Sequence, residues 1–308
     1  MSFNVPNSFQ VAYKNNVELA LNQNQSVLLG AVVEQSDASS EKVKIKDIVG
    51  NTAPNEGNER HGDTRYNNPT YDGVWLAKPN ELYYADLVDN DDQLATQIDI
   101  MGTSTMSSAG TIQRAYDQRI LEGFYGSIIS GKTGTTTTPF PNGQIIPVTT
   151  GGAAGAQRMN TAKLRAATKL LLQGYVDPNE EKYMVLTAEQ NDDLLTEIPA
   201  THADFQRAFG GVVQNGMLME MLGWKFLHLE LANPLLGTIA ATSLDGSGYR
   251  KTPFWTKKGL VANFWQKLRT DISPVPTKRL ARQIYAGTTV AASRTQPGFS
   301  GIILNSEA

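Results

Sequence analysis

Residues Gly126–Thr133 (GSIISGKT) match the spacing G-x-x-x-x-G-K-[ST], with which nucleotide-binding loops hold phosphates. In such a loop a strand leads to the first glycine and a helix begins at the Lys-Thr pair, so that backbone amides converge on the phosphates. Here a helical pattern leads in, and residues 133–141 (TGTTTTPFP) cannot readily continue as a helix because they combine β-branched threonines with prolines. Nucleotide binding is therefore an alternative hypothesis and not the leading one.

Carboxylates crowd together at two places, Asp89–Asp92 and Asp192–Asp193. Glycosidase chemistry needs two carboxylates that face each other across a sugar, and adjacent residues cannot provide this alone. The glycine and the terminal glutamate of an EF-hand do not follow Asp89 and Asp91. A solvated face or a helix N-terminus explains the acidic run better. An α/β hydrolase that uses Asp89–Asp92 is kept as a second alternative.

The chain has few residues that could support histidine or cysteine chemistry. There is no cysteine, which excludes disulfides, thiol catalysis and Cys-ligated zinc. Of the three histidines, His61 has no evident partner, and His228 lies on an expected strand beside Trp224 and Phe226, where a packed, hydrogen-bonded histidine is expected. We therefore predict no catalytic residue, no cofactor and no metal site.

The composition describes a folded chain with a balanced charge. Of 308 residues, 40% are hydrophobic, and 27 Lys and Arg stand against 30 Asp and Glu, for a net charge of −3. A dedicated nucleic-acid binder usually has a strongly basic face, so this balance argues against one. The short basic cluster Lys278, Arg279 and Arg282 is expected to be a solvated face, with a phosphate backbone or a neighbouring subunit as alternatives. Signal-peptide and membrane-span patterns are absent, and a soluble protein is expected.

The first third of the chain is predicted to contain secondary structure but few apolar residues that could form a core. Residues 8–29 suggest an arm with some helix. Residues 42–46 (KVKIK) alternate as a strand does, residues 50–73 are rich in turn formers, and residues 74–77 resume a strand. This predicts an extended hairpin with no apolar support of its own. A hairpin standing alone in water is marginal, so something else must hold it.

A long amphipathic helix is expected next, after an acidic bend over residues 82–92. Apolar side chains recur every three or four residues over 106–129, which predicts the helix. Residues 131–157 form a Thr/Gly/Pro-rich loop, in which a short hairpin is expected around Ile145–Ile146.

The remainder alternates helices and strands. Asn160 or Thr161 is expected to cap a helix that ends near Gly174, and Thr187 with Gln190 fits a capping box. A short helix is expected at 203–209. The strand candidates are 183–186, 224–230, 259–268, 283–293 and 301–304. The expected fold class is α+β.

The order of these elements, with three local sequences, resembles the major capsid proteins of tailed bacteriophages with the Hong Kong 97-type fold. The first sequence is residues 75–79 (WLAKP) with 83–92 (YYADLVDNDD), similar to the return of that family's extended loop. The second is residues 115–123 (AYDQRILEG), similar to its spine helix. The third is residues 283–294 (QIYAGTTVAASR), similar to its last strands.

The resemblance implies a domain organisation and a structural role. Residues 1–40 would be an N-terminal arm and 41–85 the extended loop; 86–134 with 271–308 would form the peripheral domain, which carries the spine helix, and 135–270 the axial domain. The chain would be a non-enzymatic subunit that self-assembles into an icosahedral shell around phage DNA, found in the virion and assembled in the host cytoplasm. The residues expected to contact neighbouring subunits are Arg65, Trp75, Lys78 and Arg279.

The partners implied by the resemblance are copies of the chain in hexamers and pentamers, a scaffolding protein, a portal and non-specifically held DNA. No long extension precedes the arm, so a separate scaffold is expected unless an extension was removed. Lys78 lies where some family members carry a cross-linking lysine. Its asparagine partner has no match, so cross-linking is not carried over.

Overall fold

The structure is a computed structural model of the whole chain. The described residues are 25–36, 40–49, 53–57, 60, 62–69, 71–89, 100–152, 155–197 and 213–307. The helix expected within 8–29 lies largely outside these ranges, and the helix expected at 203–209 lies outside them entirely.

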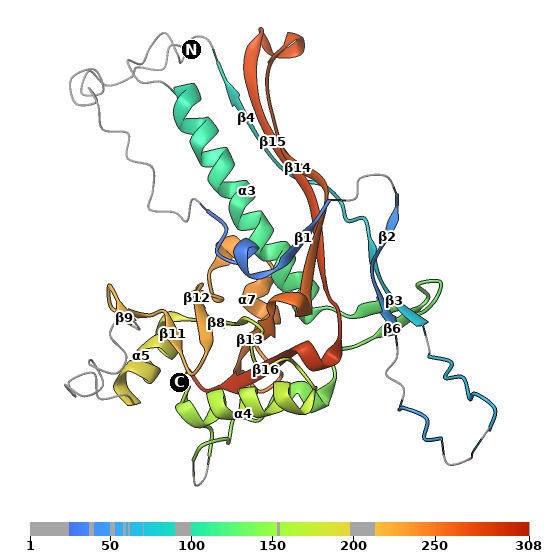
Figure 1. Cartoon of the computed structure of the whole chain (residues 1–308). Coiled ribbons are helices and arrows are strands. Elements are labelled where there is room, and N and C mark those ends of the chain that lie inside the picture. Colours follow the sequence, from blue (N-terminus) through green and yellow to red (C-terminus); the bar gives the residue numbers. More distant parts are fainter. Residues whose placement is uncertain are drawn as a thin grey trace.

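A six-stranded mixed sheet forms the centre of the lower body in Figure 1. Its order is β11 (Glu220–Met221), β12 (Trp224–His228), β8 (Lys182–Leu186), β13 (Arg250–Thr256), β16 (Ser300–Asn305) and β7 (Ile145–Ile146). The strands expected at 183–186, 224–230 and 301–304 are confirmed. The hairpin expected around Ile145–Ile146 is wrong, because these two residues pair in parallel with Ile302 and Ile303.

Both faces of this sheet are buried, because neighbouring side chains on a strand point to opposite faces. On β8, Tyr183 and Val185 pack into the cluster below the long helix, whereas Met184 and Leu186 pack into a second cluster. Two helices, α4 (Thr161–Gln173) and α5 (Ala188–Glu197), lie beside that second cluster. The body is therefore layered, with a sheet between two apolar cores.

The caps of α4 follow the prediction. The Asn160 side chain accepts a hydrogen bond from the Lys163 backbone N–H at 2.9 Å, and Gly174 is the C-terminal cap. At α5 the prediction is half right. The Gln190 backbone N–H reaches the Thr187 hydroxyl at 3.4 Å, but the Gln190 side chain bonds Glu307 and Thr252 instead of closing the box.

Lys163 is fully buried on the inner face of α4. Its ammonium group donates to the Gln157 carbonyl at 2.7 Å, the Leu304 carbonyl at 2.8 Å and the Asn305 Oδ1 at 2.9 Å. All three hydrogens are thus satisfied by neutral acceptors, which ties α4 to the C-terminal strand. Burial lowers the pKa of Lys163 to about 8, although Asp193 partly opposes the shift.

This buried lysine predicts an alkaline gain in stability. Between pH 8 and the ordinary lysine value of 10.5, the folded protein releases the Lys163 proton while the unfolded chain keeps it. The free energy of unfolding therefore rises over this window, by about 3 kcal/mol from this group. Tyrosines whose pKa values are raised by burial oppose this rise near pH 10. Denaturant titrations at several pH values therefore compare slopes: the parent protein and an exposed-site control, Lys169→Met, should both gain more stability with pH than Lys163→Met. A Lys163→Met variant with the same slope would contradict the prediction.

A second, four-stranded sheet rises from the body in the order β1 (Val33–Gln35), β14 (Leu260–Val275), β15 (Ala281–Arg294) and β4 (Leu82–Val88). The 26-residue helix α3 (Ile100–Tyr125) runs along β15 and β4 (Figure 1). A Cβ on Gly123 would overlap the Ala292 carbonyl oxygen, so glycine permits the close approach of α3 to β15.

Two expectations in this region need correction. The acidic bend expected from residue 82 is a strand up to Val88, because β4 pairs with β15 from Leu82 opposite Thr288 to Val88 opposite Arg282. The long helix is confirmed, but it begins at Ile100 instead of Met106 and ends at Tyr125 instead of Ile129. Ile128 belongs to the next strand.

β14 and β15 form a long hairpin whose lower half lies in the core and whose upper half projects. Residues 260–265 of β14 are buried, whereas residues 267–272 are exposed. The register shifts twice between these halves, at Phe264/Gln266 and at Gln266/Arg269. The strands predicted at 259–268 and 283–293 are thus confirmed, and both extend further.

A third sheet holds the root of the extended hairpin. Its order is β2 (Lys42–Val49), β3 (Tyr71–Ala77), β5 (Ile128–Ser130) and β6 (Thr136–Thr138). Val43 and Ile45 of β2 pack with Val74 and Leu76 of β3 against residues of β5 and β14. The predicted hairpin is therefore confirmed, but the prediction that it lacks apolar support is wrong at its root.

The remaining elements are short. β9 (Val213–Gln214) and β10 (Met217–Leu218) form a small hairpin near α5, and α7 (Ile239–Thr242) lies beside α3. Single 3-10 turns occupy Leu29–Ala31, Asn142–Gln144, Pro234–Leu236, Lys257–Gly259, Pro276–Lys278 and Pro297–Phe299.

Candidate functional site

The segment Gly126–Thr133 does not have the geometry of a phosphate-binding loop. Helix α3 precedes it, β5 lies inside it, and no helix begins at Thr133. The Gly131 N–H, which would face a phosphate, donates instead to the Asp72 carboxylate at 2.7 Å. The Gly131 carbonyl accepts from the Trp75 indole at 2.8 Å. The segment is an anchor for the root of the extended loop.

The other groups considered for chemistry are dispersed or structural. Asp89 is exposed at the end of β4, and Asp91 and Asp92 lie outside the described residues, as do His61 and His202. His228 Nε2 bonds the Leu218 carbonyl at 2.8 Å, as expected for a packed histidine. Across the described ranges no three His, Asp or Glu side chains cluster as metal ligands would, and no helix there is long and apolar enough to cross a membrane.

A buried carboxylate fixes the segment that leads into the body. Asp117, on α3, is fully buried and accepts hydrogen bonds from the Ser26 hydroxyl at 2.6 Å, the Val27 N–H at 3.1 Å and the Leu28 N–H at 3.0 Å. The Trp255 indole donates to the Ala31 carbonyl at 2.9 Å nearby. On α3, Asp117 lies beside the core residues Tyr116 and Ile120. The apolar pattern that predicted this helix did not include Asp117, so the sequence did not identify it as buried.

A buried cation joins the end of α3 to β15. Arg294 is fully buried, donates to the Gly126 carbonyl at 2.6 Å and lies 4.2 Å from the centre of the Phe140 ring. A cation is favourable at the C-terminal end of a helix, where carbonyl groups are unpaired. Burial nevertheless lowers the pKa of Arg294 to about 10. No spacing rule in the sequence identifies this residue.

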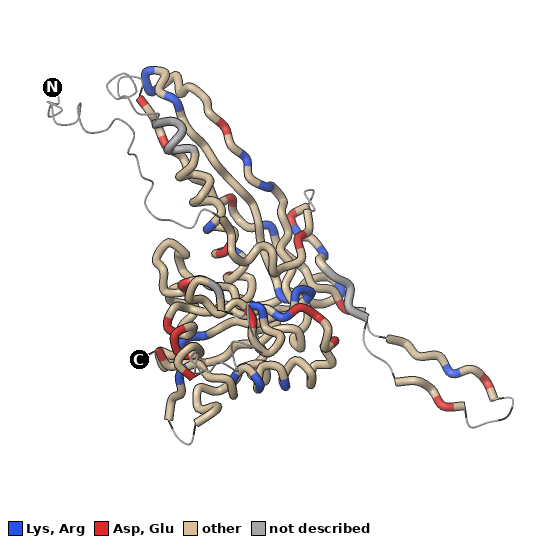
Figure 2. Tube along the Cα trace, turned by 60° about the vertical axis from the view of Figure 1, so that its left-hand side comes forward, with Lys and Arg blue, Asp and Glu red and all other residues tan. Residues whose placement is uncertain are grey.

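Beyond its root, the described part of the extended loop is exposed to solvent. The described residues 53–57 and 62–68 are all exposed, and Tyr66 is 85% exposed. The two sides of the loop are joined by Asn55 Nδ2 to the Arg65 carbonyl and by Asn67 Nδ2 to the Ala53 carbonyl, both at 2.9 Å. Figure 2 shows this loop standing away from the body.

The upper half of the β14–β15 hairpin is a second projection. Its tip carries Lys278 and Arg279, which are exposed, and Leu280, which is 59% exposed. Arg279 and Leu280 both have positive φ, 51° and 60°, a conformation that costs energy in residues other than glycine. Figure 2 shows Lys and Arg at this tip, at the opposite end of the molecule from the extended loop.

The four residues predicted to contact neighbours do not form one cluster. Arg65 lies on the outer part of the loop, and Arg279 lies at the hairpin tip. Lys78 is exposed at the loop root, beside a polar cavity of about 560 Å³. Trp75 is half-buried and engaged within its own chain, through its indole N–H and through Lys44, 5.7 Å from its ring centre.

The described residues thus form a layered α+β body with two projections. The chain belongs to the phage capsid protein family, whose model matches residues 5–307. It is accordingly a structural subunit of a phage shell and not an enzyme, and it is a component of the virion. The resemblance to phage capsid proteins is confirmed.

Solved phage capsids share the fold over nearly the full length. The chain is similar to the cyanophage Pam1 capsid protein, with a TM-score of 0.68 at 11% identity, covering 100% of this chain and 99% of that one. It is similar to the cyanophage P-SCSP1u capsid, with a TM-score of 0.67 at 12% identity, covering 96% of this chain and 92% of that one. It is also similar to the capsid of Ralstonia phage GP4, with a TM-score of 0.66 at 13% identity, covering 99% of this chain and 98% of that one. A comparison with curated proteins gives no match.

Proposed function

We propose that the chain builds an icosahedral shell around phage DNA, in which the extended loop and the β14–β15 hairpin lie across neighbouring copies. The observation that carries this is the exposure of the loop beyond its root. Ordering a backbone residue costs about 1–2 kcal/mol, and the exposed described residues, 53–57 and 62–68, recover little of it within one molecule. Contacts in a symmetric lattice supply the missing buried area.

The proposed domain division modifies the expected one so that no boundary falls within a strand. Residues 1–40 form the arm and 41–81 the loop with its return, because β4 pairs with β15 and belongs with it. The expected boundary at residue 270 falls within β14, and β16 pairs with β13 in the six-stranded sheet. We therefore assign all of β14 and β15, with α3, to the peripheral domain, and β16 to the axial domain.

The proposed contacts between subunits use the exposed members of the predicted set. Arg65 and Arg279 reach neighbours from the two projections, and Lys78 does so from the loop root. Trp75 contributes by fixing that root to Gly131. The shell would contain hexamers and pentamers, form in the host cytoplasm on a separate scaffold around a portal, and hold DNA non-specifically. The modest negative charge suits a wall that encloses DNA without gripping it.

Electron microscopy tests this proposal directly. Purified protein, expressed with and without other structural proteins of the same phage, should give closed particles or rings of five and six in negative stain. A protein that remains a monomer under all of these conditions, by sedimentation and by microscopy, would refute it.

A further inference from the structure

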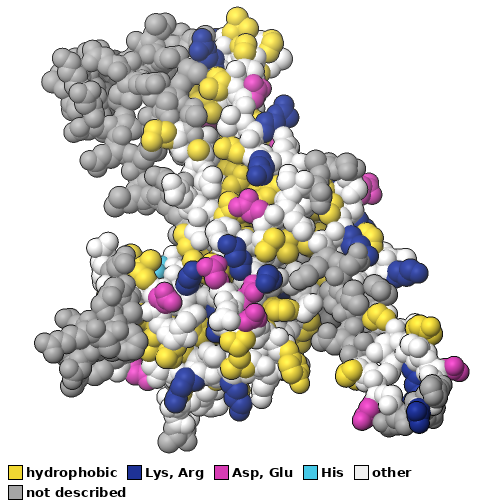
Figure 3. Space-filling view, in the orientation of Figure 1, with side chains coloured by type: hydrophobic (Ala, Val, Ile, Leu, Met, Phe, Trp, Pro, Cys, Tyr) yellow, Lys and Arg dark blue, Asp and Glu magenta, His cyan; other side chains and the backbone are white. Residues whose placement is uncertain are grey.

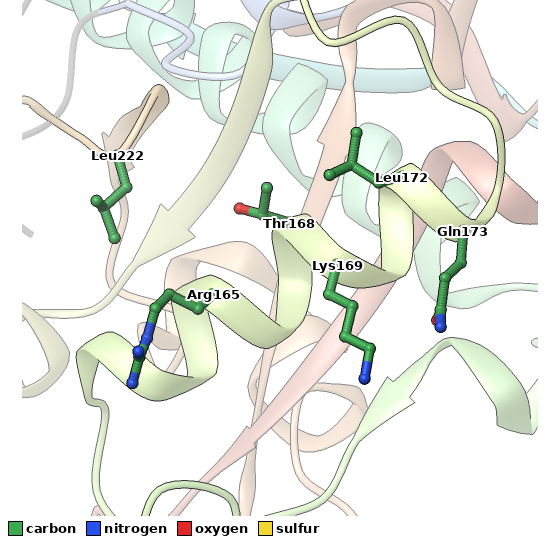
Figure 4. A pocket seen from close by; sticks show the side chains of 6 residues that line it. All are labelled: Arg165, Thr168, Lys169, Leu172, Gln173 and Leu222. Carbon is green, nitrogen blue, oxygen red and sulfur yellow. The ribbon is translucent and has the colours of Figure 1, made fainter.

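The outward face of α4 carries two cations without acidic partners. Most exposed cations nearby are paired: Arg158 with Asp193 at 3.1 Å, Lys225 with Glu181 at 2.6 Å and Lys258 with Glu180 at 2.7 Å. Arg165 and Lys169 have no carboxylate within 4.0 Å in the described part of the chain, and both are exposed. Being four residues apart, they lie on one side of the helix, one turn from each other (Figure 4).

Exposed apolar side chains stand beside these cations. Leu172 on α4 is 49% exposed, and Leu222, across from it at the turn between β11 and β12, is also 49% exposed. A cavity of about 600 Å³ opens between α4 and this turn. In Figure 3, two basic groups lie next to each other at the lower edge of the body, with hydrophobic side chains above and beside them.

The backbone is strained where this apolar surface is presented. Leu222 has φ 51°, at a turn position where Asn, Asp or Gly is favoured. Tyr175, just beyond the C-terminal end of α4, has φ 57° and is 93% exposed. Large apolar side chains on left-handed backbone stabilise neither the turn nor the core. Such strain persists where it serves a contact.

We propose that the outward face of α4, with Leu222, is the docking surface for an acidic amphipathic helix of a second protein. Carboxylates one turn apart on that helix would pair with Arg165 and Lys169, and its apolar residues would fill the trough between Leu172 and Leu222. The proposal rests on the proposed function in one respect: in the assembled shell, neighbouring copies must leave this face uncovered.

The chemistry of the face favours an acidic amphipathic helix over duplex DNA and over a second copy of the same face. Duplex DNA gains little from leucines, and affinity for DNA grows with the number of neutralised phosphates, here at most two from Arg165 and Lys169. Two copies of the face cannot pair with each other, because their like charges would meet. A contact with a different surface of a neighbouring copy is the remaining alternative, and shell formation by the charge-reversed variant tests it.

The test uses assembled shells and a labelled synthetic peptide of about 18 residues, with a leucine stripe flanked by glutamates. A second peptide has lysine in place of every glutamate. Fluorescence anisotropy should show salt-sensitive binding of the acidic peptide only. Arg165→Glu/Lys169→Glu should weaken it at least about tenfold, since two attractions become repulsions, and should admit the basic peptide. Leu222→Asn should weaken it roughly threefold to tenfold without lowering Tm, because Asn tolerates positive φ.

Lys132→Glu, a charge reversal on the turn after β5, is the control and should leave binding unchanged. The proposal is overturned if the acidic peptide does not bind, if the double variant binds it as the parent does, or if duplex DNA displaces it as effectively as unlabelled peptide. Failure of the double variant to form shells would make the face an interface between copies, which also overturns it. Shell formation by the parent protein, scored in the same samples by microscopy, tests the proposed function separately.

Discussion

Replacing residues 50–70 by the dipeptide Asn-Gly is expected to abolish closed shells while leaving the subunit folded. Val49 and Tyr71 face each other at the end of the β2–β3 ladder, so a two-residue turn can close the hairpin there. The root cluster around Val43, Leu76 and Trp265 stays intact. The deletion removes the loop beyond this root, whose described residues are exposed and therefore contribute little to the stability of a single subunit.

The expected measurement is a change from particles to unassembled subunits by sedimentation and microscopy, with Tm within a few degrees of the parent value. As a control, the double substitution Asn55→Ala/Asn67→Ala keeps the loop but removes its two internal side-chain hydrogen bonds. It should reduce the yield of particles without abolishing them. Parent-like yields from the shortened chain would show that the loop is dispensable for assembly.

Asp117→Ala is expected to lower the free energy of unfolding by about 3–5 kcal/mol, the largest effect of a single substitution considered. The alanine leaves the Val27 and Leu28 N–H groups and the Ser26 hydroxyl without their acceptor, and each unsatisfied buried group costs roughly 1–3 kcal/mol. The same change releases the segment that connects the arm to the body. Chemical denaturation measures the first effect, and protease cleavage near residue 26 reports the second.

Asp117→Asn serves as the graded comparison, because the one carbonyl oxygen of asparagine can keep part of the network. Its free energy of unfolding should lie between those of the parent protein and the alanine variant. Asp192→Ala, at an exposed position on α5, should change stability by less than about 0.5 kcal/mol. An alanine variant at position 117 as stable as the Asp192 variant would show that the carboxylate does not hold this segment.

The elements that were predictable are those whose signal is local. The alternation in residues 42–46 places Val43 and Ile45 on one face, and the structure buries both. Asn160 and Gly174 bracket α4 because capping depends on a few adjacent residues. The central strand at 183–186 was recognisable because a parallel strand buried on both faces is a continuous apolar run.

The elements that were missed depend on distant partners. Residues 82–88 look like an acidic bend, but β15, about two hundred residues later, pairs with them as a strand. Ile145–Ile146 likewise joins β16. The buried charges of Lys163 and Arg294 follow from packing, which no local spacing encodes.

The candidate site divides in the same way. Rejection of the phosphate loop was predictable, since the helix before it and the threonines and prolines after it are local features. The subunit contacts at Arg65, Lys78 and Arg279 remain predictions because their partners belong to other molecules. Trp75 illustrates the difficulty: it was predicted to contact a neighbouring subunit, and its indole N–H donates to the Gly131 carbonyl of its own chain.

The double register shift in β14 has a consequence for shell geometry. Trp265, Lys267 and Leu268 have no opposite residue in the β14–β15 ladder, and such shifts bend and twist a hairpin. The bend lies between residues 260–264, which are in the core, and the projecting half, where β4 and α3 brace β15. The bulge therefore sets the direction in which the tip leaves the body and, under the proposed assembly, the place where it meets a neighbouring copy.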